Sequence, residues 1–179
     1  AVNPRSIGVV VSGGRGTGKS AVARSMKKVV PSYIARVKGS EYNVDPGPEG
    51  VGRGEIDSFL LGQLESGERS IESMEAELIP APFVQIPLGT MEDCLVGTVD
   101  LEQSLETGVT VFSPGLLARA HRGILYVDEI NLLEDEVADI LLKVLSDGFV
   151  NVEREGLSVR YPCRPLIIAT YNPEEGELR

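Results

Sequence analysis

The sequence predicts an α/β fold with a parallel sheet at its core, and three apolar segments indicate it. These segments, residues 7–11, 123–127 and 165–170, are short and apolar, and polar residues follow each of them. Buried parallel strands have this composition because both of their faces are covered. The carboxyl ends of parallel strands lie at one edge of the sheet, where open α/β sheets bind their ligands.

A glycine-rich loop and then a helix follow the first strand. The pattern G-x-x-x-x-G-K-[ST] is completed by Gly13, Gly18, Lys19 and Ser20. Residues 21–30 carry apolar side chains at helical spacing. In this context the loop directs backbone N–H groups at the β- and γ-phosphates of a nucleotide, and the positive helix end assists. Lys19 supplies a cation, and the Ser20 hydroxyl can hold Mg²⁺. The alternative is a glycine-rich turn that binds no ligand. The strand before the loop and the helix after it disfavour this alternative, so we predict nucleoside triphosphate binding.

The second strand ends in two carboxylates. Residues 123–129 read GILYVDE, which resembles the Walker B motif of P-loop ATPases. Asp128 would hold Mg²⁺ through its water shell, since hard cations prefer carboxylate oxygen. Glu129 would orient and deprotonate the attacking water. An acidic pair can also simply open the loop before a helix expected over 132–145. Together with the glycine-rich loop, the pair favours hydrolysis.

The third strand stops at Tyr171-Asn172-Pro173. An amide at this strand end occupies the position called sensor 1, where Asn172 would contact the γ-phosphate or the attacking water. Asn-Pro is also a common turn opener, but the order of the three motifs favours the sensor. The predicted catalytic residues are Lys19, Glu129 and Asn172, and the predicted Mg²⁺ ligands are Ser20 and Asp128. The residues expected to contact ATP are Gly13, Gly14, Arg15, Gly16, Thr17, Gly18, Lys19, Ser20, Ala21 and Asp128.

Composition narrows the functional classes. The chain has 179 residues, a size that suits one domain, and a formal net charge of −10. With no basic run longer than Lys27-Lys28, nucleic acid is not an expected partner. No stretch is long enough to span a bilayer, and no signal-peptide pattern is visible. Cys94 and Cys163 lack metal-ligand spacing and are expected to be free thiols. His121 is the only histidine, and a lone imidazole is more often a structural hydrogen-bonding group than a catalyst, so no role is assigned to it.

The remaining segments are additions to this core. Residues 39–54 are rich in glycine and proline and predict an exposed loop, and 56–64 predict a helix. Residues 71–79 form an acidic amphipathic stretch before a short strand at 83–86. The gap over 39–80 is long for a connection, so we expect a surface insertion that serves a partner or a solvated acidic loop.

Two hairpins are also predicted. The first pairs 99–101 with 109–112 and leads into a helical stretch at 116–120. The second pairs 149–153 with 157–161 around a turn in which Gly156 suits a positive φ.

A core with these hairpins is similar to the AAA+ ATPases of the helix-two-insert clade. The longer motifs look like those of magnesium chelatase, and they lie at 83–89, 112–118, 121–133, 152–156 and 169–176. The resemblance covers about residues 5–38 and 81–179. Segments 82–86 and 161–172 look more like the family's D subunit than its I subunit, whereas the intact loop at 15–20 is less typical of D. On balance the resemblance favours the D subunit.

The resemblance implies a sheet in the order 5-1-4-3-2, with strands 1 to 4 at 7–12, 83–86, 124–128 and 165–170. A fifth strand, a helical lid and an arginine finger would lie beyond Arg179, so residues 1–179 are expected to form one incomplete AAA+ domain.

The implied function is to couple hydrolysis of ATP, with Mg²⁺, to insertion of magnesium into protoporphyrin IX in chlorophyll or bacteriochlorophyll biosynthesis. Expected partners are the other AAA+ chelatase subunit, in a ring, and the large porphyrin-binding subunit. The expected location is the cytoplasm of a photosynthetic bacterium or the chloroplast stroma. The alternatives are a D-type assembly platform with little ATPase activity and a MoxR-like chaperone ATPase.

Overall fold

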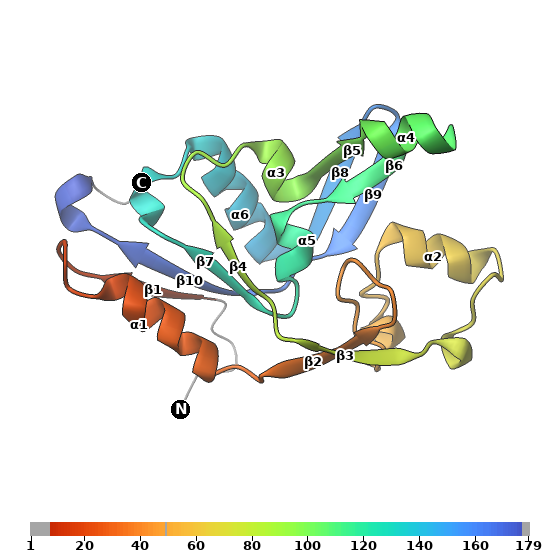
Figure 1. Ribbon diagram of the computed structural model, residues 1–179, viewed down its shortest axis with the longest axis horizontal. Helices are drawn as coiled ribbons and strands as arrows, with labels where there is room; N and C mark the ends of the chain where they lie inside the picture. Colours follow the sequence, from red (N-terminus) through yellow and green to blue (C-terminus); the bar gives the residue numbers. More distant parts are fainter. Residues whose placement is uncertain (1–7, 49, 177–179) are drawn as a thin grey trace.

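A four-stranded parallel sheet forms the centre of the molecule (Figure 1). The structure, a computed structural model, describes residues 8–48 and 50–176. The sheet order is β1–β10–β7–β4, and the strands span Gly8–Ser12, Leu166–Tyr171, Ile124–Val127 and Phe83–Ile86. In the order of the chain this is 1-4-3-2, so the predicted AAA+ order is confirmed for these four strands. Ile7, the predicted start of the first strand, lies outside the described residues.

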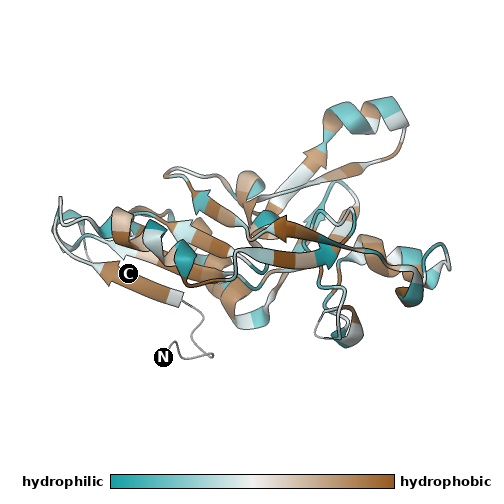
Figure 2. Ribbon diagram, turned by 60° about the horizontal axis from the view of Figure 1, so that its bottom comes forward, coloured by the Kyte–Doolittle hydropathy of each residue, from teal (hydrophilic) through white to brown (hydrophobic). Residues whose placement is uncertain are grey.

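Helices cover both faces of this sheet (Figure 1). On one face, α1 (Lys19–Ser25) buries Ala23 against Tyr126 and Ile168. On the other face lie α3 (Glu92–Val96), α5 (Leu116–Ala120) and α6 (Asp135–Asp147), whose buried side chains pack on Leu125 and Ala169. Strand alternation divides the apolar residues between the two faces, and Figure 2 shows hydrophobic residues along the strands.

Both predicted hairpins are present, and the first carries a helix at its tip. Strands β5 (Gly97–Asp100) and β6 (Val111–Pro114) pair antiparallel, and α4 (Leu101–Thr107) replaces the expected turn. Asp100 caps this helix by accepting a hydrogen bond from the Gln103 N–H. In the second hairpin, β8 (Phe149–Arg154) pairs with β9 (Leu157–Pro162). The turn between them has φ of 48° at Glu155 and 80° at Gly156, as a type I′ turn requires.

Several helix limits differ from the prediction. Helix α1 begins at Lys19 and ends at Ser25, and the 3-10 turn η1 (Met26–Lys28) follows it. The helix expected over 132–145 is α6, which the 3-10 turn η4 (Ile130–Leu132) precedes. The helix expected over 56–64 is α2 (Ser58–Glu65), where Asp57 accepts hydrogen bonds from the N–H groups of the first turn.

The prediction of an exposed loop over 39–54 is wrong in part. Tyr42, Val44 and Val51 are buried in the main core, and the Tyr42 ring lies 5.1 Å from the Tyr161 ring, centroid to centroid. Glycine and proline set the turns of this segment, which includes η2 (Val51–Arg53), but the apolar side chains between them still reach the core.

Two strands that the sequence did not predict lie on either side of residues 39–54 in the chain and pair with each other. Strand β2 (Tyr33–Val37) pairs antiparallel with β3 (Ala76–Pro80), which follows the 3-10 turn η3 (Ile71–Ser73). The acidic stretch at 71–79 therefore ends as a strand, and Glu77 makes an ion pair of 2.8 Å with Arg36 on β2.

Candidate functional site

The glycine-rich loop joins β1 to α1 and folds around the Lys19 ammonium. Lys19 Nζ donates to the carbonyl oxygens of Gly13 and Gly14 at 2.5 and 2.8 Å. Gly18 has a φ of +76° at the start of the helix, a conformation that strongly favours glycine. The Gly13 N–H donates to the Tyr171 carbonyl at 3.2 Å, which fastens the loop to the end of β10. The sequence thus places a cation inside a backbone loop, as phosphate binding requires.

Asp128 follows β7, and three hydroxyl groups donate to its Oδ1 atom. The distances to Oδ1 are 2.5 Å from Thr170, 2.8 Å from Tyr126 and 3.3 Å from Ser20. Burial raises the pKa of the Asp128 carboxyl, but the hydrogen bonds outweigh it, and that pKa lies below its ordinary value. The carboxylate is therefore ionised near neutral pH.

Glu129 has an unusual backbone conformation. Its φ of 51° and ψ of 61° lie in the left-handed region, which is uncommon for a residue with a side chain. Its N–H donates to Thr170 Oγ1 at 2.9 Å. Such conformations persist where neighbouring contacts hold them, and they are frequent at functional sites.

Asn172 follows β10 and is 1% exposed. Its Oδ1 atom accepts a hydrogen bond from the Glu174 N–H at 3.2 Å and opens the 3-10 turn η5 (Pro173–Glu175). The backbone carbonyl of Asn172 accepts a hydrogen bond from Asn131 Nδ2 at 3.4 Å. The side-chain oxygen of Asn172 thus has the ordinary role of an Asn-Pro sequence, which is to accept a hydrogen bond within a turn. The amide nitrogen is the group that a sensing role would use.

The predicted site residues come together to different degrees. Lys19, Ser20 and Asp128 are linked to the loop or to one another by the contacts above, and Glu129 is adjacent. The other loop positions have a different setting: Arg15, Gly16, Thr17, Gly18 and Ala21 are exposed. Among them, Thr17 donates to the Gly14 carbonyl at 2.9 Å and so braces the loop.

Sequence reasoning missed two side chains that contact Asp128. Tyr126 and Thr170 lie two residues before Asp128 and Asn172, respectively. Residues two apart on a strand project from the same face, so this spacing predicts that Tyr126 lies on the face of Asp128. For Thr170 it indicates only the face of Asn172, not the contact with Asp128 on the neighbouring strand.

The donor set fits Mg²⁺ bound together with a nucleotide. Within the described residues there is no cluster of three or more His, Cys, Asp or Glu side chains that could hold a metal alone. Ser20 and Asp128 instead offer hard oxygen donors side by side, and Mg²⁺ commonly completes its shell with substrate phosphates and water.

The remaining single residues have structural settings. His121, to which the sequence assigned no role, is buried, and its Nδ1 accepts a hydrogen bond from the Arg164 N–H at 3.0 Å, which is a structural contact. Cys94 and Cys163 are free cysteines, as expected. In the part of the chain that the structure describes, the helices are too short or too polar to span a bilayer.

Comparison with known proteins identifies a family that this chain matches and relatives that it resembles. A family model described as "Magnesium chelatase, subunit ChlI" matches residues 81–177. The chain is 45% identical to the magnesium-chelatase 38 kDa subunit of Chlorobaculum tepidum over 181 residues, covering 99% of this chain and 43% of that protein. It is also 45% identical to the chloroplastic magnesium-chelatase subunit ChlI of Glycine max, covering 99% of this chain and 40% of that protein. The chain thus spans less than half the length of these two relatives.

A solved structure of a complex is also similar. It is described as a model of the complex between subunits BchI and BchD of magnesium chelatase, and a chain in it matches with a TM-score of 0.71 and 41% identity. The match covers 98% of this chain and 50% of that one. The expected preference for the D subunit over the I subunit is not confirmed, because relatives named by subunit are ChlI proteins. The chain belongs to the magnesium chelatase subunit ChlI family.

Proposed function

We propose that this chain is the ATP-hydrolysing AAA+ module of an I-type magnesium chelatase subunit. In that role it would couple ATP hydrolysis to insertion of magnesium into protoporphyrin IX. The observation that carries the proposal is the contact between Ser20 and Asp128, which brings the phosphate loop against the acidic pair. The names of the ChlI relatives support the I type, as does the intact loop from Gly13 to Ser20.

The residues would divide the chemistry of hydrolysis among themselves. The loop N–H groups and Lys19 would bind the β- and γ-phosphates, with the ammonium exchanging its carbonyl partners for phosphate oxygens. Ser20 and Asp128 would hold Mg²⁺, which supplies charge neutralisation at the phosphates. Because Ser20 donates its proton toward Asp128, its oxygen lone pairs are available as a ligand. Glu129 would take a proton from the attacking water, and the Asn172 amide nitrogen would donate to the γ-phosphate or that water.

The proposed partners are the other AAA+ chelatase subunit and the large porphyrin-binding subunit. The similar solved structure is of a BchI–BchD complex, which supports association between AAA+ subunits. A ring in which a neighbour supplies an arginine to the ATP site would stabilise the charge that develops during phosphoryl transfer. The chloroplastic name of the Glycine max relative supports a place in the chloroplast stroma, and the Chlorobaculum tepidum relative supports the cytoplasm of a photosynthetic bacterium.

The test measures ATP hydrolysis and magnesium protoporphyrin formation by the full-length protein mixed with its two partner subunits. We expect both activities in the wild type and neither in Asp128→Asn, which keeps the shape of the side chain but lacks its charge. Asp147→Asn on the exposed end of α6 is the matched control and should behave like the wild type.

Two results would contradict the proposal. If Asp128→Asn still hydrolyses ATP, Asp128 is not the magnesium ligand that hydrolysis requires. A wild-type protein that supports assembly and chelation without hydrolysing ATP itself would instead indicate a D-type platform.

A further inference from the structure

One hydroxyl group connects the two acidic residues of the site. Thr170 Oγ1 donates to Asp128 Oδ1 at 2.5 Å and accepts the Glu129 N–H at 2.9 Å. Thr170 is fully buried, so water does not compete for either bond. A threonine hydroxyl has one donor and two acceptor positions, and this one is used in both directions.

The other hydroxyl groups near Asp128 do not make this connection. Tyr126 and Ser20 also donate to Asp128 Oδ1. Among the described residues, the Glu129 N–H donates its hydrogen bond to Thr170 and not to either of these two hydroxyl groups. Thr170 is therefore the side chain that fixes the proposed magnesium ligand and the proposed base relative to each other.

The bond to Glu129 acts on a conformation that needs support. A left-handed backbone is disfavoured for a residue with a Cβ atom, and Glu129 adopts it at φ 51°. Directing the N–H of Glu129 at Thr170 holds the peptide in that orientation. Without this acceptor the backbone of Glu129 would relax toward a more common conformation, and its side chain would change direction.

Thr170 also stands between this acidic pair and the phosphate loop. It lies on β10, the strand between β1 and β7, and is two residues before Asn172. The neighbouring Tyr171 carbonyl accepts the Gly13 N–H at 3.2 Å. The end of β10 therefore touches the loop, the acidic pair and the proposed sensor at successive residues.

We propose that Thr170 is a positioning residue for ATP hydrolysis, which holds Asp128 and the backbone of Glu129 in register with Asn172. The inference rests on the proposed function. The inference predicts a defect in the use of Mg²⁺ and in turnover, with little change in nucleotide affinity. Among the described residues, the hydrogen bonds of Thr170 go to Asp128 and Glu129, not to Lys19 or to the loop N–H groups that would bind phosphate.

The experiment compares Thr170→Val with Thr170→Ser in the full-length protein together with its partner subunits. Valine keeps the branched shape and removes the hydroxyl, whereas serine keeps the hydroxyl. For Thr170→Val we expect kcat to fall about tenfold to a hundredfold, the range for lost hydrogen bonds to charged groups. The Mg²⁺ concentration for half-maximal activity should rise, and KM for ATP should stay within about twofold. Thr170→Ser should restore kcat to within about threefold of the wild type.

A second buried threonine provides the matched control. Thr90 is 9% exposed and donates to the Pro87 carbonyl at 2.6 Å, outside the contacts of the site. Thr90→Val should lower the melting temperature and leave kcat and the Mg²⁺ requirement unchanged. If Thr170→Val does not fold, Thr170→Cys keeps a γ atom that is a weak donor, and the same kinetic losses are expected from it.

The possible outcomes separate this inference from the proposed function. Wild-type kcat and Mg²⁺ dependence in a folded Thr170→Val protein would overturn the inference alone. An equal loss in Thr170→Ser would also overturn it, because packing and not the hydroxyl would then be responsible. A wild-type protein that binds no nucleotide would overturn the inference and the proposed function together.

Discussion

Ser20 and Asp128 are 108 positions apart in the chain, yet the serine hydroxyl donates to the aspartate carboxylate at 3.3 Å. The topology of the sheet explains this contact. Ser20 lies in the first turn of α1, the helix that follows β1 and the loop. Asp128 follows β7, and β10 pairs in parallel with both strands. Parallel pairing places the carboxyl ends of these strands at one edge. The same fold therefore assembles both parts of the proposed ATP site within this one chain.

Replacement of Lys19 by alanine should strongly weaken ATP binding. The Lys19 ammonium is held between the Gly13 and Gly14 carbonyls, inside the loop that would receive the phosphates. Charged contacts to phosphate are among the stronger hydrogen bonds, so we expect affinity to fall about a hundredfold. Equilibrium binding of labelled ATP measures the change.

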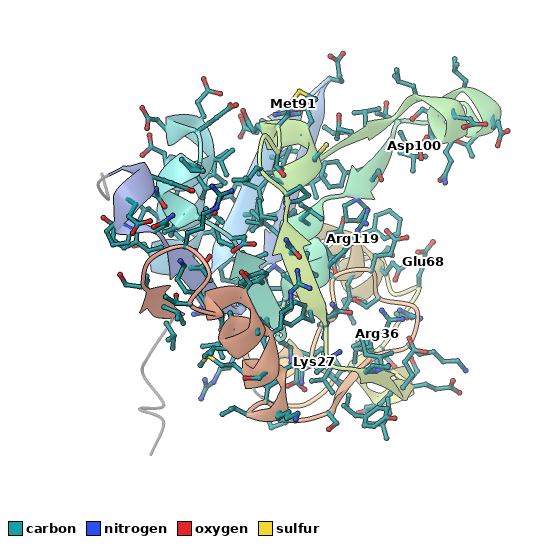
Figure 3. All side chains as sticks on the ribbon, turned by 60° about the vertical axis from the view of Figure 1, so that its left-hand side comes forward. Lys27, Arg36, Glu68, Met91, Asp100 and Arg119 are labelled. Carbon is teal, nitrogen blue, oxygen red and sulfur yellow. The ribbon has the colours of Figure 1, made fainter. Side chains whose placement is uncertain are left out.

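The control for this prediction is Lys27→Ala. Lys27 lies in η1 after α1 and is exposed (Figure 3). Its removal changes the net charge equally but should leave the affinity for ATP unchanged. Unchanged affinity in Lys19→Ala would show that the loop does not bind the phosphates.

Replacement of Glu129 by glutamine should separate binding from hydrolysis. The amide keeps the size of the side chain and leaves Asp128 intact, but it cannot accept the proton of the attacking water. ATP should bind with near wild-type affinity and persist, and turnover should fall at least about a hundredfold. Phosphate release by the full-length assembly tests this, with the exposed Glu134→Gln as control. Turnover at the wild-type rate would mean that Glu129 is not the base.

The central strands could be predicted because their signal is local. Segments such as 124–127 are apolar without interruption, and their flanking residues show where they stop. The contact of Thr170 with Asp128 could not be predicted in the same way. It depends on the register that pairs Tyr126 with Ile168, and therefore on which strands are neighbours. Parity along each strand identifies the face of a side chain but not its partner across the sheet.

The part of the fold that escaped prediction is held by distant contacts. Strand β2 alternates poorly: Tyr33 is 62% exposed, and Arg36 projects toward Glu77 on β3. The burial of Tyr42 comes from Tyr161 on β9, far along the chain. The spacing of apolar residues in a segment and its content of glycine and proline do not identify residues that contact it from elsewhere in the chain. The loop at 39–54 was therefore predicted to be exposed.

Two glycine substitutions should change stability in opposite directions. At Gly123, before β7, a methyl group would lie 2.3 Å from the Pro82 carbonyl oxygen, so Gly123→Ala should cost about 1–3 kcal/mol through overpacking. Gly62 lies inside α2 with open space around its Cα atom, so Gly62→Ala should add about 0.5–1 kcal/mol. Urea unfolding of both variants gives the two values. A stable Gly123→Ala would show that the contact of Pro82 with the start of β7 relaxes easily.

Protonation of His121 should weaken the fold below neutral pH. Burial, with Arg122 and Arg164 nearby, lowers the pKa of His121 from 6.5 to about 3. Between these values the unfolded chain binds a proton that the folded chain excludes, so stability falls as the pH falls. The slope for one such group is at most about 1.4 kcal/mol per pH unit, which gives a loss of about 2 kcal/mol at pH 5.

The variant His121→Asn isolates this effect from the other titrating groups. The asparagine oxygen can still accept the Arg164 N–H, as His121 Nδ1 does at 3.0 Å, but it takes up no proton in this range. We expect the wild type to lose about 2 kcal/mol more than the variant between pH 7.5 and pH 5, measured by urea unfolding at each pH. Carboxylates such as Asp128 and Asp57 titrate in both proteins, so their contributions cancel in the difference. Equal losses in the two proteins would show that the folded state accommodates the imidazolium.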